Sequence, residues 1–120
     1  MEAITADELI EKLKKFEDEY IITKLEGNIE EEIDMKLAEV NKVKDFIEFI
    51  YNKNKRKVFG NSLKINFHQI KNIESDEDTE FYIYLDGNQK IIIFTDIDVY
   101  YNYSVFRITN NIKNIGKASI

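Results

Sequence analysis

The chain contains no cysteine, no proline and no tryptophan, and it has a single histidine, His68. Without thiols it can form no disulfide, no thiolate metal site and no cysteine nucleophile. A single histidine also excludes a zinc site built on paired histidines. Because no nucleophile or orienting acid stands at a recognisable spacing from His68, we interpret it as a structural or surface residue.

Glycine is scarce as well, and the four glycines are too scattered to form a loop that cradles a phosphate. The serines lie in no nucleophile-elbow sequence. Asp96 and Asp98 stand two positions apart, so on a strand both carboxylates would point to one side and could hold Mg²⁺. We favour loop or helix-capping roles for this pair. The sequence therefore predicts a protein that is not an enzyme and uses neither cofactor nor metal.

Long apolar runs are missing too. No stretch reaches the roughly 18 consecutive apolar residues of a membrane span. The N-terminal sequence MEAITADELIEKLKK is charged throughout and lacks the apolar run of a signal peptide. We expect a cytoplasmic protein without membrane contact, and the lack of cysteine is compatible with a reducing compartment.

Basic residues are outnumbered by acidic ones. The chain has 23 Asp and Glu against 17 Lys and Arg, which gives a net charge of −6 and a pI near 4.9. This balance argues against direct nucleic-acid binding, which needs a basic face, and suits a partner protein that is itself basic. Residues with AT-rich codons are abundant, a bias typical of AT-rich bacteria and of their phages and other mobile elements.

The length of 120 residues predicts one domain, residues 1–120, with a core of its own. Thr5 and Glu8 have the spacing of a capping box, in which each side chain bonds the other residue's amide. Apolar residues follow at helical spacing, namely Leu9, Leu13, Phe16 and Tyr20. We therefore predict a helix over residues 6–19.

Residues 20–37 allow two interpretations. In the first, Gly27 ends the first helix and Asn28 caps a second, whose N-terminal dipole is complemented by the three glutamates that follow. In the second, Gly27 and Asn28 form a hairpin turn. The hairpin would pair Tyr20 with Met35, Ile22 with Ile33, and Lys24 with Glu31. We favour a helix over residues 30–52, and residues 38–52 are helical in both interpretations.

A basic run, NKNKRK, stands at the end of this predicted second helix. Its cations are Lys53, Lys55, Arg56 and Lys57. Positive charge at a helix C-terminus complements the helix dipole, which is sufficient reason for the run. The alternative is contact with a phosphate or an acidic partner.

Three strands are predicted at residues 62–67, 80–86 and 90–95, the last two joined by a turn at Asp86–Gln89. This strand pair is apolar on both faces, which favours a central place in a sheet. Residues 97–115 combine strand-type residues with a helical period of apolar positions, so they are either strand or helix.

The predicted fold class is α+β. N-terminal amphipathic helices pack on a small antiparallel sheet, and the C-terminal segment is left undecided between strand and helix. The helical residues expected to face the sheet are Leu9, Leu13, Phe16, Ile47 and Ile50.

An acidic tract precedes the central strand pair, with carboxylates at Asp76, Glu77, Asp78 and Glu80. A calcium loop that began at Asp76 would need glycine at its sixth position and glutamate at its twelfth, where the chain has Phe81 and Gly87. We therefore interpret the tract as a solvated loop that keeps the following strand soluble. The alternative is an acidic rim around a binding patch.

Tyrosines are the most suggestive side chains, because they are enriched at protein interfaces and also form strands well. We predict a small acidic binding protein that inhibits or neutralises a partner protein through a basic surface of that partner. Candidate classes are mobile-element inhibitors of host defence, including mimics of nucleic-acid charge, and immunity or antitoxin proteins. The predicted partner-binding residues are Asp76, Glu77, Asp78, Glu80, Tyr82, Tyr84, Tyr101 and Tyr103.

Two other functions remain as alternatives. One is a small-molecule-binding domain with a tyrosine-lined pocket. The other is a metal-dependent hydrolase that uses Asp96 and Asp98.

Overall fold

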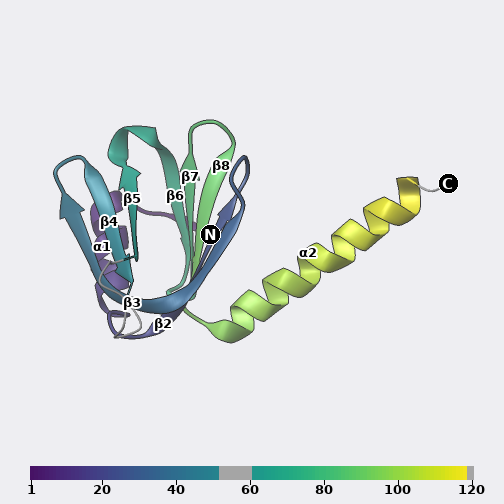
Figure 1. The fold of residues 1–120 in the computed structure, drawn as a ribbon, viewed down its shortest axis with the longest axis horizontal. Helices are drawn as coiled ribbons and strands as arrows, with labels where there is room; N and C mark the ends of the chain where they lie inside the picture. Colours follow the sequence, from purple (N-terminus) through teal and green to yellow (C-terminus); the bar gives the residue numbers. More distant parts are fainter. Residues whose placement is uncertain (52–60, 119–120) are drawn as a thin grey trace.

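The computed structural model describes residues 1–51 and 61–118. Within them, eight antiparallel strands form one sheet in the order β1-β6-β7-β8-β2-β3-β4-β5. The sheet curves around α1, whereas α2 runs away from it (Figure 1). The elements are β1 (Glu2–Ala3), α1 (Ala6–Lys14), β2 (Tyr20–Glu26), β3 (Glu31–Val43), β4 (Phe46–Tyr51), β5 (Asn61–Asn66), the 3₁₀ turn η1 (Phe67–Gln69), β6 (Ile70–Asp76), β7 (Glu80–Leu85), β8 (Gln89–Phe94) and α2 (Ile97–Ala118).

The predicted fold class is wrong in its balance, because strands replace most of the expected N-terminal helix. β3 and β4 occupy the segment predicted as a helix over residues 30–52. The pairing of β3 with β4 shifts register between Leu37 and Glu39, and such a bulge changes the phase of the side chains along a strand. Leu37 and Val40 therefore both lie in the core although they are three residues apart. A spacing of three is also that of apolar residues on one face of a helix, so this part of the sequence resembled a helix.

The hairpin interpretation of residues 20–37 is the correct one, with a different register. Tyr20 lies opposite Lys36 and Lys24 opposite Glu32, one position from the expected pairs. The connecting loop packs on the β7–β8 turn, where a Cβ on Gly27 would lie 2.2 Å from the Asn88 carbonyl oxygen. Two hydrogen bonds of 2.9 Å also join Gln89 to the backbone of the loop. These contacts hold the longer loop that this register needs.

The N-terminal helix begins as predicted, since Thr5 and Glu8 form both bonds of the capping box. It ends at Lys14 rather than residue 19 because the next segment bonds to β3 instead. The Asp18 amide donates to the Leu37 carbonyl oxygen over 2.7 Å, and the Leu37 amide donates to Glu19 over 3.0 Å.

The inner face of the sheet, which faces α1, carries the main core. Alternate residues of each strand point into it, as the period of two requires, so β7 contributes Phe81 and Ile83 and β8 contributes Ile91 and Ile93. The predicted helix residues Leu9 and Leu13 are fully buried there, with Phe16 packed against them. Ile47 also lies in this core but on β4, and Ile50 lies on the other face of that strand.

Other sequence predictions have mixed outcomes. Each of the three predicted strands is confirmed to within one residue, as β5, β7 and β8. The undecided C-terminal segment is a helix, α2, with Asp96 as its cap: the Asp98 amide donates to Asp96 Oδ1 over 2.9 Å. The basic run at residues 53–57 lies outside the described residues. Among the helices described, none is both long and apolar enough to cross a membrane.

Candidate functional site

The outer face of the sheet, opposite α1, carries a second and smaller apolar cluster. Ile22, Tyr82, Ile92 and Phe94 form it, and the first turns of α2 pack on it. The Phe94 ring lies 5.2 Å from that of Tyr103 and 5.5 Å from that of Tyr100, centroid to centroid. These contacts fix the start of α2 on β8 and β2.

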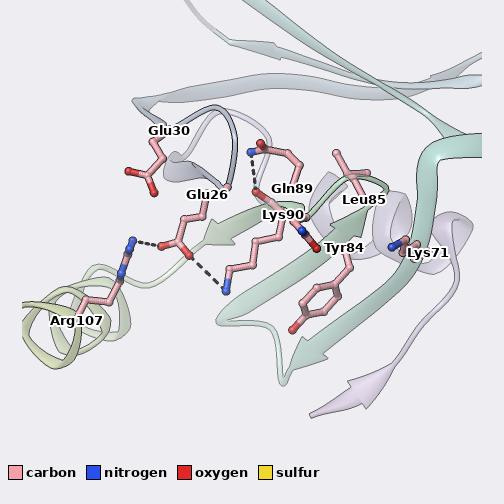
Figure 2. Close-up of a pocket in the computed structure, with 10 residues that line it drawn as sticks. Glu26, Glu30, Lys71, Tyr84, Leu85, Gln89, Lys90 and Arg107 are labelled. Atoms are coloured by element: carbon pink, nitrogen blue, oxygen red, sulfur yellow. Dashed lines mark hydrogen bonds and ion pairs between the residues drawn. The ribbon is translucent and has the colours of Figure 1, made fainter. Parts of the chain in front are cut away.

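A buried carboxylate, Glu26, extends this contact along α2. Its side chain accepts a hydrogen bond of 2.5 Å from the Tyr103 hydroxyl, and the Arg107 guanidinium bonds the same oxygen. Lys90 lies 3.4 Å from its other carboxylate oxygen (Figure 2). Lys24 lies 3.9 Å from the oxygen that Tyr103 bonds. Burial would raise the pKa of Glu26, but the bond from Tyr103 and the nearby Arg107 and Lys90 outweigh it and lower that pKa. Glu26 therefore stays ionised, and cations of the same molecule balance its negative charge.

A shallow pocket of about 430 Å³ lies beside this cluster. Arg107 and Glu26 border it on one side, and Tyr84 and Lys71 lie on the other (Figure 2). Of the tyrosines in the described residues, only Tyr84 lines this pocket. Basic side chains outnumber acidic ones along its walls, three to two, so its charge favours a small anion over an apolar ligand.

The acidic tract forms the end of the β6–β7 hairpin. Asp76 lies directly opposite Glu80, and Glu74 lies opposite Tyr82, so these four side chains share the outer face. Partial burial first, and the nearby Asp76 second, raise the pKa of Glu80, although the Tyr82 hydroxyl donates to Glu80 Oε2 over 2.9 Å. Glu77 occupies the turn with a positive φ of 52°.

The carboxylates of this hairpin differ in whether a cation of the same chain pairs with them. Lys12 of α1 lies 3.1 Å from Asp78, so this acid is paired. The other four form no ion pair within the parts of the chain that the structure describes. We call this set the acidic hairpin: Glu74, Asp76, Glu77 and Glu80.

The predicted tyrosines separate into different environments. Tyr82 is 8% exposed, and its ring stacks on that of Tyr84 at 6.3 Å. Tyr84 is half-buried on the outer face beside the acidic hairpin. Tyr103 is used to hold Glu26, whereas Tyr101 is 58% exposed and points away from the sheet side of α2. The predicted set therefore forms one surface only on the β6–β7 hairpin.

Three residues of the site lie outside the predicted set, and they differ in whether a local sequence pattern indicates them. Glu74 could have been found, because it stands two positions before Asp76 on a strand and so shares its face. Glu26 and Arg107 are 81 residues apart and leave no local pattern. His68 is exposed in η1. No group of three or more His, Asp or Glu side chains that could hold a metal occurs among the residues that the structure describes.

Comparison with known proteins finds no matching protein-family model, no matching curated protein and no matching solved structure. The interpretation of the site therefore depends on its own geometry.

Proposed function

We propose that the protein is a non-enzymatic binding protein of the cytoplasm that inhibits or neutralises a partner by covering a basic surface. The observation that carries this proposal is the directly opposed pair Asp76 and Glu80, which lies without a cation among the described residues. Like charges placed opposite each other across a hairpin destabilise it. An arginine or lysine from a partner would remove this cost on binding.

The neighbouring side chains make the pair suitable for such a contact. Tyr82 donates to Glu80 and holds its carboxylate on the outer face. Glu74 extends the acidic row along β6, and Tyr84 offers a half-buried ring beside it. Aromatic residues and charge-assisted bonds to arginine are common at the centre of protein interfaces.

The whole-chain charge supports the same function. A net charge of −6 would accelerate encounter with a cationic surface and would disfavour direct binding to nucleic acid. Proteins that work in this way include mobile-element inhibitors of host defence, some of which mimic nucleic-acid charge, and immunity proteins or antitoxins. We place this chain in that broad class.

The test compares two variants that lose the same charge. The first carries Asp76→Asn, Glu77→Gln and Glu80→Gln, and it spares Asp78 because that residue binds Lys12. A partner is captured from the native host with the wild-type chain, and its affinity is then measured at increasing salt. We expect affinity for a basic partner to fall with salt and to fall more than about tenfold in this variant.

The control variant carries Glu11→Gln, Glu19→Gln and Asp45→Asn, three exposed acids outside the acidic hairpin. It should retain most of the affinity, because only the general attraction is reduced. Equal losses of affinity in the two variants would mean that net charge, and not the acidic hairpin, determines the binding. A partner whose affinity does not depend on salt would contradict the proposal.

A second candidate function is the binding of a small anionic ligand in the pocket beside Glu26. Lys71, Lys90 and Arg107 all border this pocket, whose volume lies within the usual range for ligands. Native mass spectrometry of the purified chain would detect a bound anion. Loss of that species in Lys71→Gln, whose side chain makes no ion pair among the described residues, would favour this function over the first.

A further inference from the structure

The shallow pocket beside Glu26 has one aromatic wall, the side chain of Tyr84. Tyr82 stacks on one side of this ring, with an angle of 17° between the two ring planes. The two tyrosines stand two positions apart on β7, so the opposite side of the Tyr84 ring faces the end of the strand, where Asn88 of the β7–β8 turn also lines the pocket. The pocket therefore meets the ring face that Tyr82 leaves open.

A bulge in β6 places a lysine beside this ring. Asn72 lies opposite Tyr84, and the pairing then skips Lys71, which has no direct partner on β7. Ile70 and Ile73 both pack in the main core although they are three positions apart, and the extra residue takes up this change of phase. Lys71 therefore stays exposed and lines the pocket, on the same side of it as Tyr84 (Figure 2). Bulges often direct a side chain toward a functional site in this way.

Two lysines thus flank the Tyr84 ring, one from each neighbouring strand. Lys90 is the residue of β8 directly opposite Tyr84, and Lys71 reaches the pocket from β6. Lys71 forms no ion pair within the parts of the chain that the structure describes, whereas Lys90 is shared with Glu26. An aromatic face between two ammonium groups suits a ligand that has both a flat ring and a phosphate, because the ring can stack while the phosphate oxygens accept hydrogen bonds.

The acids around the pocket leave the charge of Lys71 in place. Glu26 is already balanced by its own cations, and Glu30 is exposed, so water and salt screen it. Burial first, and the nearby Glu74 second, raise the pKa of Tyr84, so its hydroxyl stays neutral and adds no negative charge. Lys71 therefore supplies a positive charge that an anionic ligand can use.

We propose that this pocket binds a free nucleotide, with its base on the open face of Tyr84 and its phosphate at Lys71 and Lys90. This inference rests on the second candidate function, the binding of a small anionic ligand, and specifies the chemical class of that ligand. A pocket of about 430 Å³ suits one small molecule, and the net charge of −6 disfavours a long nucleic-acid strand. Stacking on an aromatic ring tolerates every base, so we expect little preference among bases.

Titration of the purified full chain with defined probes, followed by NMR, tests the proposal. The probes are the ribonucleoside 5′-monophosphates of adenine, guanine, cytosine and uracil, the matching ribonucleosides, and inorganic phosphate, all at equal ionic strength. We expect the monophosphates to bind at least about tenfold more tightly than the nucleosides or phosphate, because each of these offers only one of the two contacts. The amide signals of Lys71, Tyr84 and Lys90 should shift together during the titration.

Three substitutions assign the contacts. Lys71→Gln should weaken the monophosphates about fivefold, the upper range for an exposed ion pair, and should leave the nucleosides unchanged. Tyr84→Leu should weaken both kinds of probe, whereas Tyr84→Phe keeps the ring and should retain their binding. Lys14→Gln is the matched control for charge, since Lys14 is an exposed residue of α1, on the other face of the sheet. The two cations that hold Glu26 are left unchanged, because replacing them would also disturb α2.

The possible outcomes separate this proposal from the two proposed functions. If inorganic phosphate bound as tightly as the monophosphates, the nucleotide assignment would be wrong while the anion pocket remained. No binding of any monophosphate at millimolar concentration, or equal weakening by Lys14→Gln and Lys71→Gln, would overturn the proposal. Tighter binding of a short single-stranded oligonucleotide would also contradict it, because that result requires contacts outside the pocket. The triple variant of the acidic hairpin should bind the monophosphates no less tightly than wild type, so failure of the partner proposal would leave this one standing.

Discussion

Glu26 and the acidic hairpin lie on the outer face of one sheet, but they differ in whether cations of the same chain balance their charge. Glu26 is buried, yet Arg107, Lys90 and the Tyr103 hydroxyl surround it and its pKa falls. In the acidic hairpin, Glu80 is less buried, but its pKa rises because burial and Asp76 act in the same direction. Burial alone therefore does not determine the state of a carboxyl group.

The difference separates structural charge from charge that is available for binding. A buried acid with its own cations contributes to the fold, since removing one partner leaves the others uncompensated. Opposed acids without cations lower stability slightly and gain from an external cation. On this reasoning, Glu26 should matter for folding and the acidic hairpin for binding.

The largest effect on stability should come from introducing a carboxylate where neither a cation nor water can reach it. Ile83 is fully buried at the centre of β7, between Ile73 and Ile91. Ile83→Asp should cost several kcal/mol and unfold the protein, because an isolated buried charge has no compensation. Circular dichroism and thermal melting would measure this loss.

The adjacent residue provides the control for this substitution. Tyr84 points to the outer face and is half-buried, so Tyr84→Asp should leave a folded protein with lower stability. A folded Ile83→Asp variant would show that the inner face is not the main core.

The next effect concerns Glu26. Glu26→Gln removes the charge that Arg107, Lys90 and Lys24 share. Since these cations remain partly solvated, we expect the free energy of unfolding to fall by about 2 kcal/mol, less than for a fully buried pair. Urea denaturation measures the change. Hydrogen exchange should also show faster opening at the start of α2, because Tyr103 loses its charged acceptor.

The same residue predicts an acid dependence with a definite sign. The pKa of Glu26 is lower in the folded protein, so its contribution is present above the ordinary glutamate value of about 4.3 and is lost as the pH falls below it. Stability of Glu26→Gln should therefore depend less on pH in this range. Glu74→Gln is the control, as this acid has no ion pair among the described residues. Equal acid dependence in wild type and Glu26→Gln would show that the cluster adds no stability.

The sequence predicted those parts of the fold that local patterns determine. The capping box of α1 and the alternating residues of β7 and β8 depend on neighbours a few positions away, and these elements were predicted. β3 was mistaken for a helix because its bulge after Leu37 interrupts the alternation. The tyrosines at 100, 101 and 103 are strand-type residues in a helix, so their period and their residue type disagreed.

The candidate site was predictable only where it is local. The sequence identified the acidic tract Asp76, Glu77, Asp78 and Glu80 as a group, but it missed Glu74, and the pairing of Asp78 depends on Lys12 of another element. The Glu26 cluster joins β2, β8 and α2, and no spacing in the sequence indicates which cations approach that residue. Such contacts follow from the order of strands in the sheet, which one sequence does not reveal.

The smallest effect should have the opposite sign to that of Glu26. Glu80→Gln removes one of two opposed charges while its amide oxygen can still accept from Tyr82. We expect the free energy of unfolding at pH 7 to rise by about 0.5 kcal/mol, the scale of a cross-strand charge pair. Because the pKa of Glu80 is raised in the folded protein, its ionisation costs stability as the pH rises through that pKa. The gain from Glu80→Gln should therefore disappear at low pH.

A double-mutant cycle with Asp76→Asn isolates the repulsion from other effects of the change. If the two carboxylates destabilise each other, either single substitution removes the cost, so the double variant should gain less than the sum of the two. Additive gains would mean that each acid is unfavourable by itself, through burial rather than through its neighbour. The opposed pair would then give no reason for a partner's cation to bind between Asp76 and Glu80, and the acidic hairpin would lose its role in the proposed function.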